Sequence, residues 1–229
     1  MDKPTVSLAI ETSCRAGGLV LAAGAQQHRA ISFDASSRHA THLISHLAEM
    51  VRQAGLKPAD IDEVYVSAGP GSFTGVRVGI AAVRTMAQAM PHLRCVAVPT
   101  PMAVAENTHD LAWENLAVIL DARDGWIHAS LFVRQEGLIE PVDGWAGLYR
   151  PEEFLAGAPR PLLLVGEGLA FHQLSAPGVS AADPSLHLPT AEAVWRVGNR
   201  LARAGRFTEY HDLLPIYTRS PHVTTPHRK

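Results

Sequence analysis

The fold of this chain is decided by the stretch Ala68-Gly69-Pro70-Gly71-Ser72-Phe73-Thr74-Gly75-Val76-Arg77. A short apolar run, Val64-Tyr65-Val66, comes before it, and residues 78–86 follow it with a helical pattern. This order predicts a buried strand, a glycine turn and a helix. A turn of this kind leaves backbone N–H groups at the start of the helix, where they suit an anion.

The turn does not match the common phosphate-binding signatures. No Gly-Lys-Ser or Gly-Lys-Thr follows it, and its glycines lack the G-x-G-x-x-G spacing of dinucleotide-binding folds. A tight turn that only positions the helix is therefore favoured, and a phosphate site stays open. Ser72 and Thr74 are interpreted as helix caps rather than nucleophiles, because no histidine or aspartate is placed by sequence to activate them.

Length and composition allow one large domain or two lobes with real cores. The chain has 229 residues, a formal charge of -2 and 47% hydrophobic residues. This near-neutral balance does not indicate a broad basic face for nucleic acid. Two cysteines, Cys14 and Cys95, predict a reducing, cytoplasmic setting. No membrane association is expected, because no segment reaches the roughly 18 apolar residues that a span needs.

The two halves of the chain open in the same way, with a strand, an acidic residue, a turn and a second strand. The first strand of the first half ends at Glu11, and that of the second half ends at Asp121. We interpret these carboxylates as corresponding positions in an imperfect internal duplication. Helices are expected over residues 37–54, from the glycine turn to Met90, and over residues 191–204.

A polar stretch near residues 107–115 separates the halves and predicts lobes at 1–108 and 109–229. Strands followed by helices, given twice, indicate two related α/β lobes. The sugar kinase, Hsp70 and actin superfamily is built in this way. There, a carboxylate ends the first strand of each lobe and faces nucleotide and metal in the cleft between the lobes.

The chain resembles the TsaB family, also called YeaZ. The resemblance covers the first half well and continues more loosely to the end of the chain. It implies an actin-like ATPase fold whose second lobe is shortened. The residues that carry it are Leu8-Ala9-Ile10-Glu11-Thr12-Ser13, Arg38-His39, Gly69 to Gly79, Asp121-Ala122-Arg123 and Pro215-Ile216-Tyr217-Thr218-Arg219.

The resemblance implies a role in making N6-threonylcarbamoyladenosine, the tRNA modification beside the anticodon. In that pathway one enzyme makes threonylcarbamoyl-adenylate from threonine, bicarbonate and ATP, and TsaD transfers the threonylcarbamoyl group to the adenosine amine. TsaB serves as a non-catalytic, dimeric partner of TsaD, with the small ATPase TsaE as a third component. The family pattern further implies a homodimer when TsaD is absent, and only indirect contact with tRNA.

No firmly bound cofactor is expected from this resemblance. It leaves room for ATP or ADP at an interface with a partner, with Glu11, Thr12, Gly69 and Gly71 as the candidate contacts. The chain departs from the family at Glu11, where aspartate is common. It departs again after Asp121-Ala122-Arg123, where Trp126 and His128 replace an acidic residue and a tyrosine.

The sequence predicts no catalytic residue and no metal site. TsaD-type enzymes hold a metal with a His-x-Glu-Gly-His element, and the corresponding residues 99–105 contain neither histidine nor carboxylate. This argues against a metallopeptidase. His42 and His46 have a feasible metal-ligand spacing, but a half-exposed stripe or an interface is favoured for them. A stand-alone actin-like ATPase or phosphotransferase is the alternative, supported by Glu11 and Asp121 and opposed by the short second lobe.

A partner interface is predicted on the two helices of the first lobe. Gly75 and Gly79 share one helix face, and a glycine inside a helix costs roughly 1 kcal/mol relative to alanine. A close backbone approach offsets such a cost, either to the neighbouring strand or to a helix of another subunit. Arg77 is a candidate for a partner carboxylate or a phosphate. The predicted interface residues are His39, His42, Leu43, His46, Gly75, Arg77, Gly79 and Val83.

Overall fold

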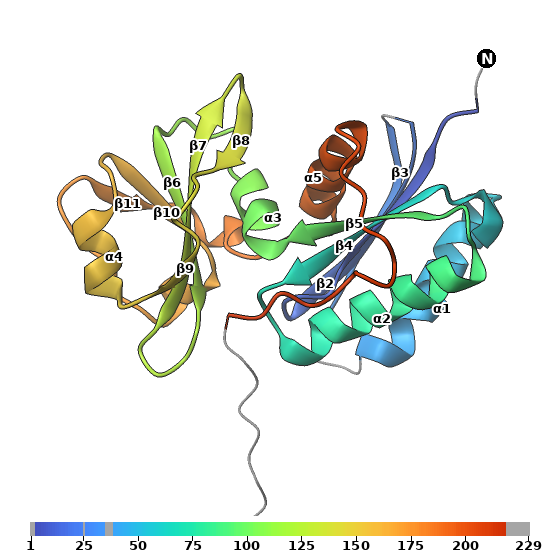
Figure 1. The fold of residues 1–229 in the computed structure, drawn as a ribbon, viewed down its shortest axis with the longest axis horizontal. Helices are drawn as coiled ribbons and strands as arrows, with labels where there is room; N and C mark the ends of the chain where they lie inside the picture. Colours follow the sequence, from blue (N-terminus) through green and yellow to red (C-terminus); the bar gives the residue numbers. More distant parts are fainter. Residues whose placement is uncertain (1–2, 25, 35–38, 219–229) are drawn as a thin grey trace, which may run out of the picture.

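The computed structural model describes residues 3–218, except 25 and 35–38. It contains two β-sheets, each covered by helices on both faces (Figure 1). The strands of the first sheet are β1 (Val6–Glu11), β2 (Ala16–Ala23), β3 (Gln26–Asp34), β4 (Glu63–Gly69) and β5 (Arg94–Pro99). Those of the second are β6 (Asn115–Asp121), β7 (Ile127–Gln135), β8 (Leu138–Pro141), β9 (Gly147–Tyr149), β10 (Leu162–Val165) and β11 (Val179–Ala181).

The two sheets share one topology. The first has the order β3-β2-β1-β4-β5, and the second contains the equivalent order β8-β7-β6-β10-β11. In the first sheet, β1 pairs antiparallel with β2 and parallel with β4, and in the second sheet β6 pairs antiparallel with β7 and parallel with β10. The internal duplication is therefore confirmed at the level of strand order and direction. Glu11 and Asp121 end equivalent strands, as expected.

The first sheet is covered by long helices. On one face lie α1 (His39–Gln53) and α2 (Phe73–Ala89), whose apolar side chains pack with those of β1 and β4. The other face is covered by α5 (Ala191–Arg203), where Trp195 and Val197 pack against Ala9 and Tyr65. Gly198 permits this approach, because a Cβ there would collide with the Tyr65 ring.

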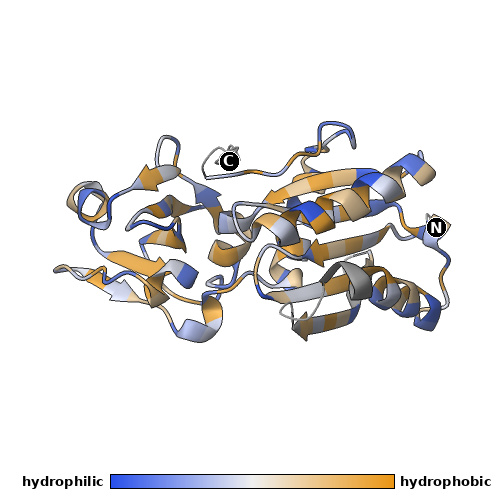
Figure 2. Cartoon of the chain, turned by 90° about the horizontal axis from the view of Figure 1, so that it is seen from below, coloured by the Kyte–Doolittle hydropathy of each residue, from blue (hydrophilic) through white to orange (hydrophobic). Residues whose placement is uncertain are grey.

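Short helices cover the second sheet. The helix α3 (Thr100–Glu106) lies on one face, and α4 (Pro151–Gly157) covers the other with Phe154. Single 3-10 turns, η1 (Pro58–Asp60), η2 (Glu167–Ala170) and η3 (Pro184–Leu186), complete the elements. Hydrophobic residues concentrate on the strands and on the helix faces turned toward them (Figure 2).

Two helices, α3 and α5, each pack on the sheet of the lobe that they do not directly follow in the chain. The helix α3 follows the last strand of the first sheet, yet Val104 and Ala105 pack on the second sheet. The helix α5 follows the second sheet and returns to the first. The chain then stays on the first lobe, since Leu213 is buried in its core and Ile216 N donates to Ala68 O. The division at 108/109 stays a prediction. The helix α5 and the following residues Leu213 and Ile216 pack with the first lobe.

Candidate functional site

The glycine turn between β4 and α2 is held by the first lobe itself. Ser72 caps α2, because its Oγ accepts from Gly75 N at 3.3 Å, and its backbone N donates to Ser13 O at 2.6 Å. The interpretation of Ser72 as a cap is confirmed. The backbone N–H groups of Ser72 and Gly75 are therefore already used in hydrogen bonds within the first lobe.

The glycines of this turn allow it to sit directly against the end of β1. A Cβ at Gly71 would collide with Ser13 O, and one at Gly75 with Thr12 O. A Cβ at Gly79 would collide with Thr12 Oγ1. Of the two approaches that the glycine spacing left open, the structure shows the one to the neighbouring strand. Whether a helix of another subunit also packs on this part of α2 stays a prediction.

Glu11 lies inside the first lobe and does not line the space between the lobes. It is fully buried, and its Oε1 accepts bonds from Ser13 N and from Ser13 Oγ at 2.7 Å. Within the described part of the chain, its Oε2 has no hydrogen-bond partner. Burial disfavours the charged form and raises the pKa of Glu11 to about 7, against the lowering effect of the Ser13 bonds.

The other three candidate cofactor contacts, Thr12, Gly69 and Gly71, lie in different surroundings. Thr12 is fully buried, and its hydroxyl finds no partner among the described residues. Gly69 faces the carbonyl of Ile216, which a Cβ would meet. Gly71 alone of the four lines the cleft between the lobes. Glu11 and Thr12 do not line that cleft, and their contact with a nucleotide stays a prediction.

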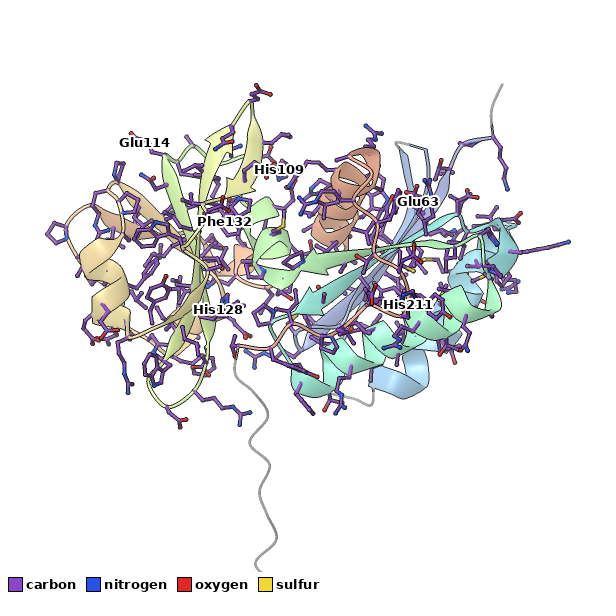
Figure 3. The ribbon with its side chains drawn as sticks, viewed as in Figure 1. Glu63, His109, Glu114, His128, Phe132 and His211 are labelled. Atoms are coloured by element: carbon purple, nitrogen blue, oxygen red, sulfur yellow. The ribbon has the colours of Figure 1, made fainter. Side chains whose placement is uncertain are left out.

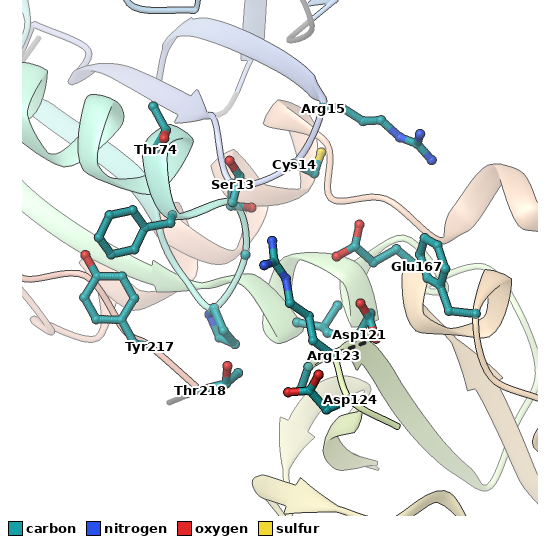
Figure 4. Close-up of a pocket in the computed structure, with 17 residues that line it drawn as sticks. Ser13, Cys14, Arg15, Thr74, Asp121, Arg123, Asp124, Glu167, Tyr217 and Thr218 are labelled. Atoms are coloured by element: carbon teal, nitrogen blue, oxygen red, sulfur yellow. Dashed lines mark hydrogen bonds between the residues drawn. The ribbon is translucent and has the colours of Figure 1, made fainter. Parts of the chain in front are cut away.

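A cleft of about 970 Å³ opens between the lobes (Figure 4). The first lobe supplies the β1–β2 turn, the glycine turn and the end of the described chain. The second lobe supplies the β6–β7 turn, η2 and Phe171. The lining residues are Ser13, Cys14, Arg15, Pro70, Gly71, Ser72, Phe73, Thr74, Leu120, Asp121, Ala122, Arg123, Asp124, Glu167, Phe171, Tyr217 and Thr218.

The polar side of the cleft is centred on Asp121. Its Oδ1 lies 2.9 Å from His172 Nε2 and accepts from Arg123 N at 3.1 Å. Arg123 and Asp124 both have positive φ angles, a conformation that turns the β6–β7 loop sharply. Burial and the nearby Asp121 raise the pKa of Glu167, while Arg15 opposes this. Asp121 thus occupies the position at the cleft that Glu11 does not.

The opposite side carries aromatic rings. Phe73 and Tyr217 stack with ring centroids 5.3 Å apart, and the Arg77 guanidinium lies 4.7 Å from the Phe73 ring. Phe171 comes from the second lobe, with 66% of its surface exposed. The side chains in the cleft can therefore stack on a planar group and bond polar groups beside it.

The charges in the cleft do not favour a polyphosphate. Its lining contains two guanidinium groups, Arg15 and Arg123, and three carboxyl groups, Asp121, Asp124 and Glu167. Among the residues that the structure describes, no group of three or more histidine, cysteine or acidic side chains could hold a metal ion. Sequence reasoning missed Arg15, Glu167 and Phe171 as cleft residues, and His172 as the partner of Asp121. The equivalence of β10 with β4 was the one signal that could have indicated Glu167.

The predicted interface residues lie in two different environments. Leu43 and Val83 belong to the core of the first lobe, as Gly75 and Gly79 do. His46 is exposed and stacks on Phe33 with centroids 5.4 Å apart. Arg77 is exposed at the start of α2. His39 and His42 lie on α1, and their side chains are outside the described part of the structure.

Trp126 and His128, the departures from the family pattern, follow the turn that carries Arg123. The Arg150 guanidinium lies 4.3 Å from the Trp126 ring. His128 is half-buried on β7 and is labelled in Figure 3. Burial lowers its pKa, and its Nδ1 has no partner among the described residues. Neither residue lines the cleft.

Fold and site define a two-lobed α/β protein with a duplicated sheet and a cleft between the lobes. The structure of YeaZ from Pseudomonas aeruginosa is similar, with 24% identity and a TM-score of 0.81, over 93% of this chain and 99% of that one. A second structure, described as an uncharacterized protein with similarity to peptidase YEAZ from Pseudomonas aeruginosa, is 23% identical with a TM-score of 0.79, over 94% and 100% of the chains.

Sequence comparisons agree with the structural likeness. A family model described as TsaD, tRNA N6-adenosine threonylcarbamoyltransferase, matches residues 33–144. The tRNA threonylcarbamoyladenosine biosynthesis protein TsaB of Bacillus subtilis is 26% identical over 143 residues, which is 59% of each chain. TsaB of Escherichia coli is 25% identical over 192 residues, covering 80% of this chain and 81% of that protein. These matches support membership of the TsaB family, also called YeaZ.

Proposed function

We propose that this chain is a non-catalytic partner and scaffold of a TsaD threonylcarbamoyltransferase, required to form N6-threonylcarbamoyladenosine beside the tRNA anticodon. Its curated relatives are named for the biosynthesis of this nucleoside. The observation that carries the proposal is the burial of Glu11, the residue at the end of the first strand. In an actin-like ATPase, whose fold we assign to this chain, that position faces nucleotide and metal.

The segment that corresponds to the TsaD metal element supports the same proposal. Residues 99–105 end β5 and form α3, which lies between the two sheets. Pro101, Ala103, Val104 and Ala105 are buried there as apolar packing. This segment joins the lobes and presents no acidic or histidine side chain to the cleft.

We place the partner contact on the exposed surface of α1 and α2. The buried residues Leu43, Gly75, Gly79 and Val83 support this surface from beneath, whereas His46, Arg77 and the 53% exposed Ile44 face outward. TsaD is the proposed partner, a second copy takes its place when TsaD is absent, and tRNA is contacted indirectly. Among the described residues, no helix is long and apolar enough to cross a membrane. We place the chain in the cytoplasm.

The proposal assigns no firmly bound cofactor to the chain alone. The two guanidinium groups of the cleft face three carboxyl groups, which disfavours ATP without a partner. ATP or ADP at an interface with TsaD is part of the proposal. A stand-alone ATPase or phosphotransferase is the second candidate, and the volume of the cleft favours it. Steady-state ATP hydrolysis by the purified chain distinguishes the two.

Reconstitution tests the scaffold role. We expect no modification of tRNA by the purified chain, and modification when TsaD, TsaE and the threonylcarbamoyl-adenylate synthase are added, measured by mass spectrometry of tRNA nucleosides. Transfer by the lone chain would contradict the proposal. Ile44→Lys should weaken capture of TsaD, because it places a charge on the proposed contact surface. Leu138→Lys is the matched control, since Leu138 is an apolar residue of the second lobe with 46% exposure.

A further inference from the structure

A second, smaller pocket lies at the opposite end of the first sheet. Its volume is about 290 Å³, and it is formed where β1, β4 and β5 begin, beside the last turn of α5. It shares no residue with the cleft between the lobes. Glu63, which lines it, is labelled in Figure 3. The lining residues are Thr5, Ser7, Gly24, Glu63, Tyr65, Arg94, Asn199, Ala202 and Arg203.

The floor of this pocket is buried and its hydrogen bonds are made. The Glu63 carboxylate accepts from the Tyr65 hydroxyl and forms an ion pair with Arg94. Ser7 Oγ accepts from Trp195 Nε1 at 2.9 Å, which ties α5 to the start of β1. Ser7, Glu63 and Tyr65 are all less than one-tenth exposed. The one negative charge of the pocket is therefore already paired.

The helix α5 forms one wall of the pocket and contributes the hydrogen-bond donors of Asn199 and Arg203, which are not bonded to the residues of the floor. Asn199 and Arg203 are four residues apart on the helix, so they share the face that lines the pocket. Within residues 3–218 as described, neither side chain makes a hydrogen bond or an ion pair. Arg94 adds a half-exposed guanidinium whose remaining N–H groups stay available.

The dipole of α5 disfavours a negative group at its C-terminal end, so the guanidinium groups must outweigh it. The last carbonyls of the helix are already bonded, since Ala204 N donates to Arg200 O, Gly205 N to Ala202 O and Arg206 N to Leu201 O. The pocket then holds two guanidinium groups against one carboxylate, a net charge of +1. The helix α5 is anchored through Ser7 and Tyr65, and these contacts involve neither Asn199 nor Arg203.

We propose that this pocket is a binding site for a small oxyanion, a single carboxylate or phosphate group, held by Arg203 and Asn199 with help from Arg94. Guanidinium and amide N–H groups are the donors that such anions select, and charge-assisted bonds of this kind are the stronger ones. The site is independent of the cleft and of the proposed partner surface, so it can be tested on the chain alone.

Nuclear magnetic resonance of the ¹⁵N-labelled full chain tests the site. Inorganic phosphate and acetate are titrated separately, each against sodium chloride at equal ionic strength. We expect saturable shifts of the Asn199 side-chain amide and of the backbone amides of 199–203, with the tighter of the two anions identifying the class. If neither anion shifts these signals beyond chloride, the proposal is wrong.

Two surface variants make the test specific. Arg203→Gln should weaken binding about tenfold, because it removes one charge-assisted bond. Arg206→Gln is the matched control, since Arg206 is exposed three residues further along and does not line the pocket. Equal affinities for the two variants would overturn the proposal, and both are surface changes whose folding is checked from the same spectra.

Discussion

The two lobes of this protein have one strand order and very different coverings. In the first lobe, α1 has 15 residues and α2 has 17, and together they cover one face of the sheet. At the equivalent places in the second lobe stand α4, with seven residues, and the single turn η2, with four. A duplicated sheet can therefore lose its helices, provided that its exposed face is covered in another way.

The exchange of α3 and α5 provides that covering. Because α3 packs on the second sheet and α5 on the first, each lobe is completed by a helix that follows the other lobe's last strand. Each sheet is therefore covered in part by a helix that follows the other sheet in the chain.

The first prediction concerns the glycine face of α2, which only the first lobe has. Gly79→Arg should destabilise the protein by more than about 4 kcal/mol, or prevent folding, because its side chain would enter the contact with Thr12 and Val66. Ala81→Arg, on the exposed side of the same helix, should change stability by less than about 0.5 kcal/mol. Thermal unfolding followed by circular dichroism measures both. A folded Gly79→Arg protein of normal stability would show that α2 does not sit on β1 in this way.

The elements of the two lobes also differ in how well they can be predicted from the sequence. The strands that end at Glu11 and Asp121, the strand before the glycine turn, and the helices α1, α2 and α5 could be predicted, because their apolar residues form clear patterns. The elements β9, α4 and β11 could not. They are three to seven residues long and mostly half-exposed, so their patterns carry no period.

The candidate site was harder to predict than the fold. Arg15, Glu167, Phe171 and Tyr217 come from separate segments, and only the tertiary structure brings them to one cleft. The direction in which Gly75 and Gly79 face also depends on which neighbour lies closer, and spacing along a helix does not contain that information. Glu11 was located correctly at the strand end, but its enclosure depends on Ser13, which turns back to bond it.

The second prediction compares the equivalent carboxyl groups Glu11 and Asp121. The pKa of Glu11 is raised to about 7 in the folded chain, above its ordinary value of 4.5. Glu11 therefore stabilises the fold most below about pH 4.5, and this contribution is lost as pH rises through 7. The loss should reach about 3 kcal/mol in the free energy of unfolding, at 1.36 kcal/mol per pKa unit.

Urea unfolding between pH 5 and 8 measures this effect in matched variants. Glu11→Gln should flatten the fall in stability, since the amide cannot ionise. Asp121→Asn should retain it, because Asp121 is half-exposed at the cleft and Glu11 is unchanged in that variant. A Glu11→Gln protein with the slope of the unmodified chain would mean that Glu11 is not the group that titrates.

The smallest effect is expected where the exchanged helices meet. Glu106 of α3 is buried, and its two oxygens lie 3.2 Å from Arg196 Nε and 3.1 Å from Arg200 Nη1 of α5. Arg200 also donates to Ile139 O on the second sheet, so one cluster joins α3, α5 and β8. Glu106→Gln keeps the shape but removes the charge, and leaves two guanidinium groups without a counter-charge.

We expect Glu106→Gln to lower the free energy of unfolding by about 2 kcal/mol, below the value for fully buried pairs because both arginines are partly exposed. Glu49→Gln, which breaks the exposed pair with Arg52, should cause no measurable change. Amide hydrogen exchange then tests whether the two lobes are stabilised together. If α3 and α5 complete each other's lobes, Glu106→Gln should speed amide exchange in both sheets together. Faster exchange in the second sheet alone would show that the lobes are stabilised separately.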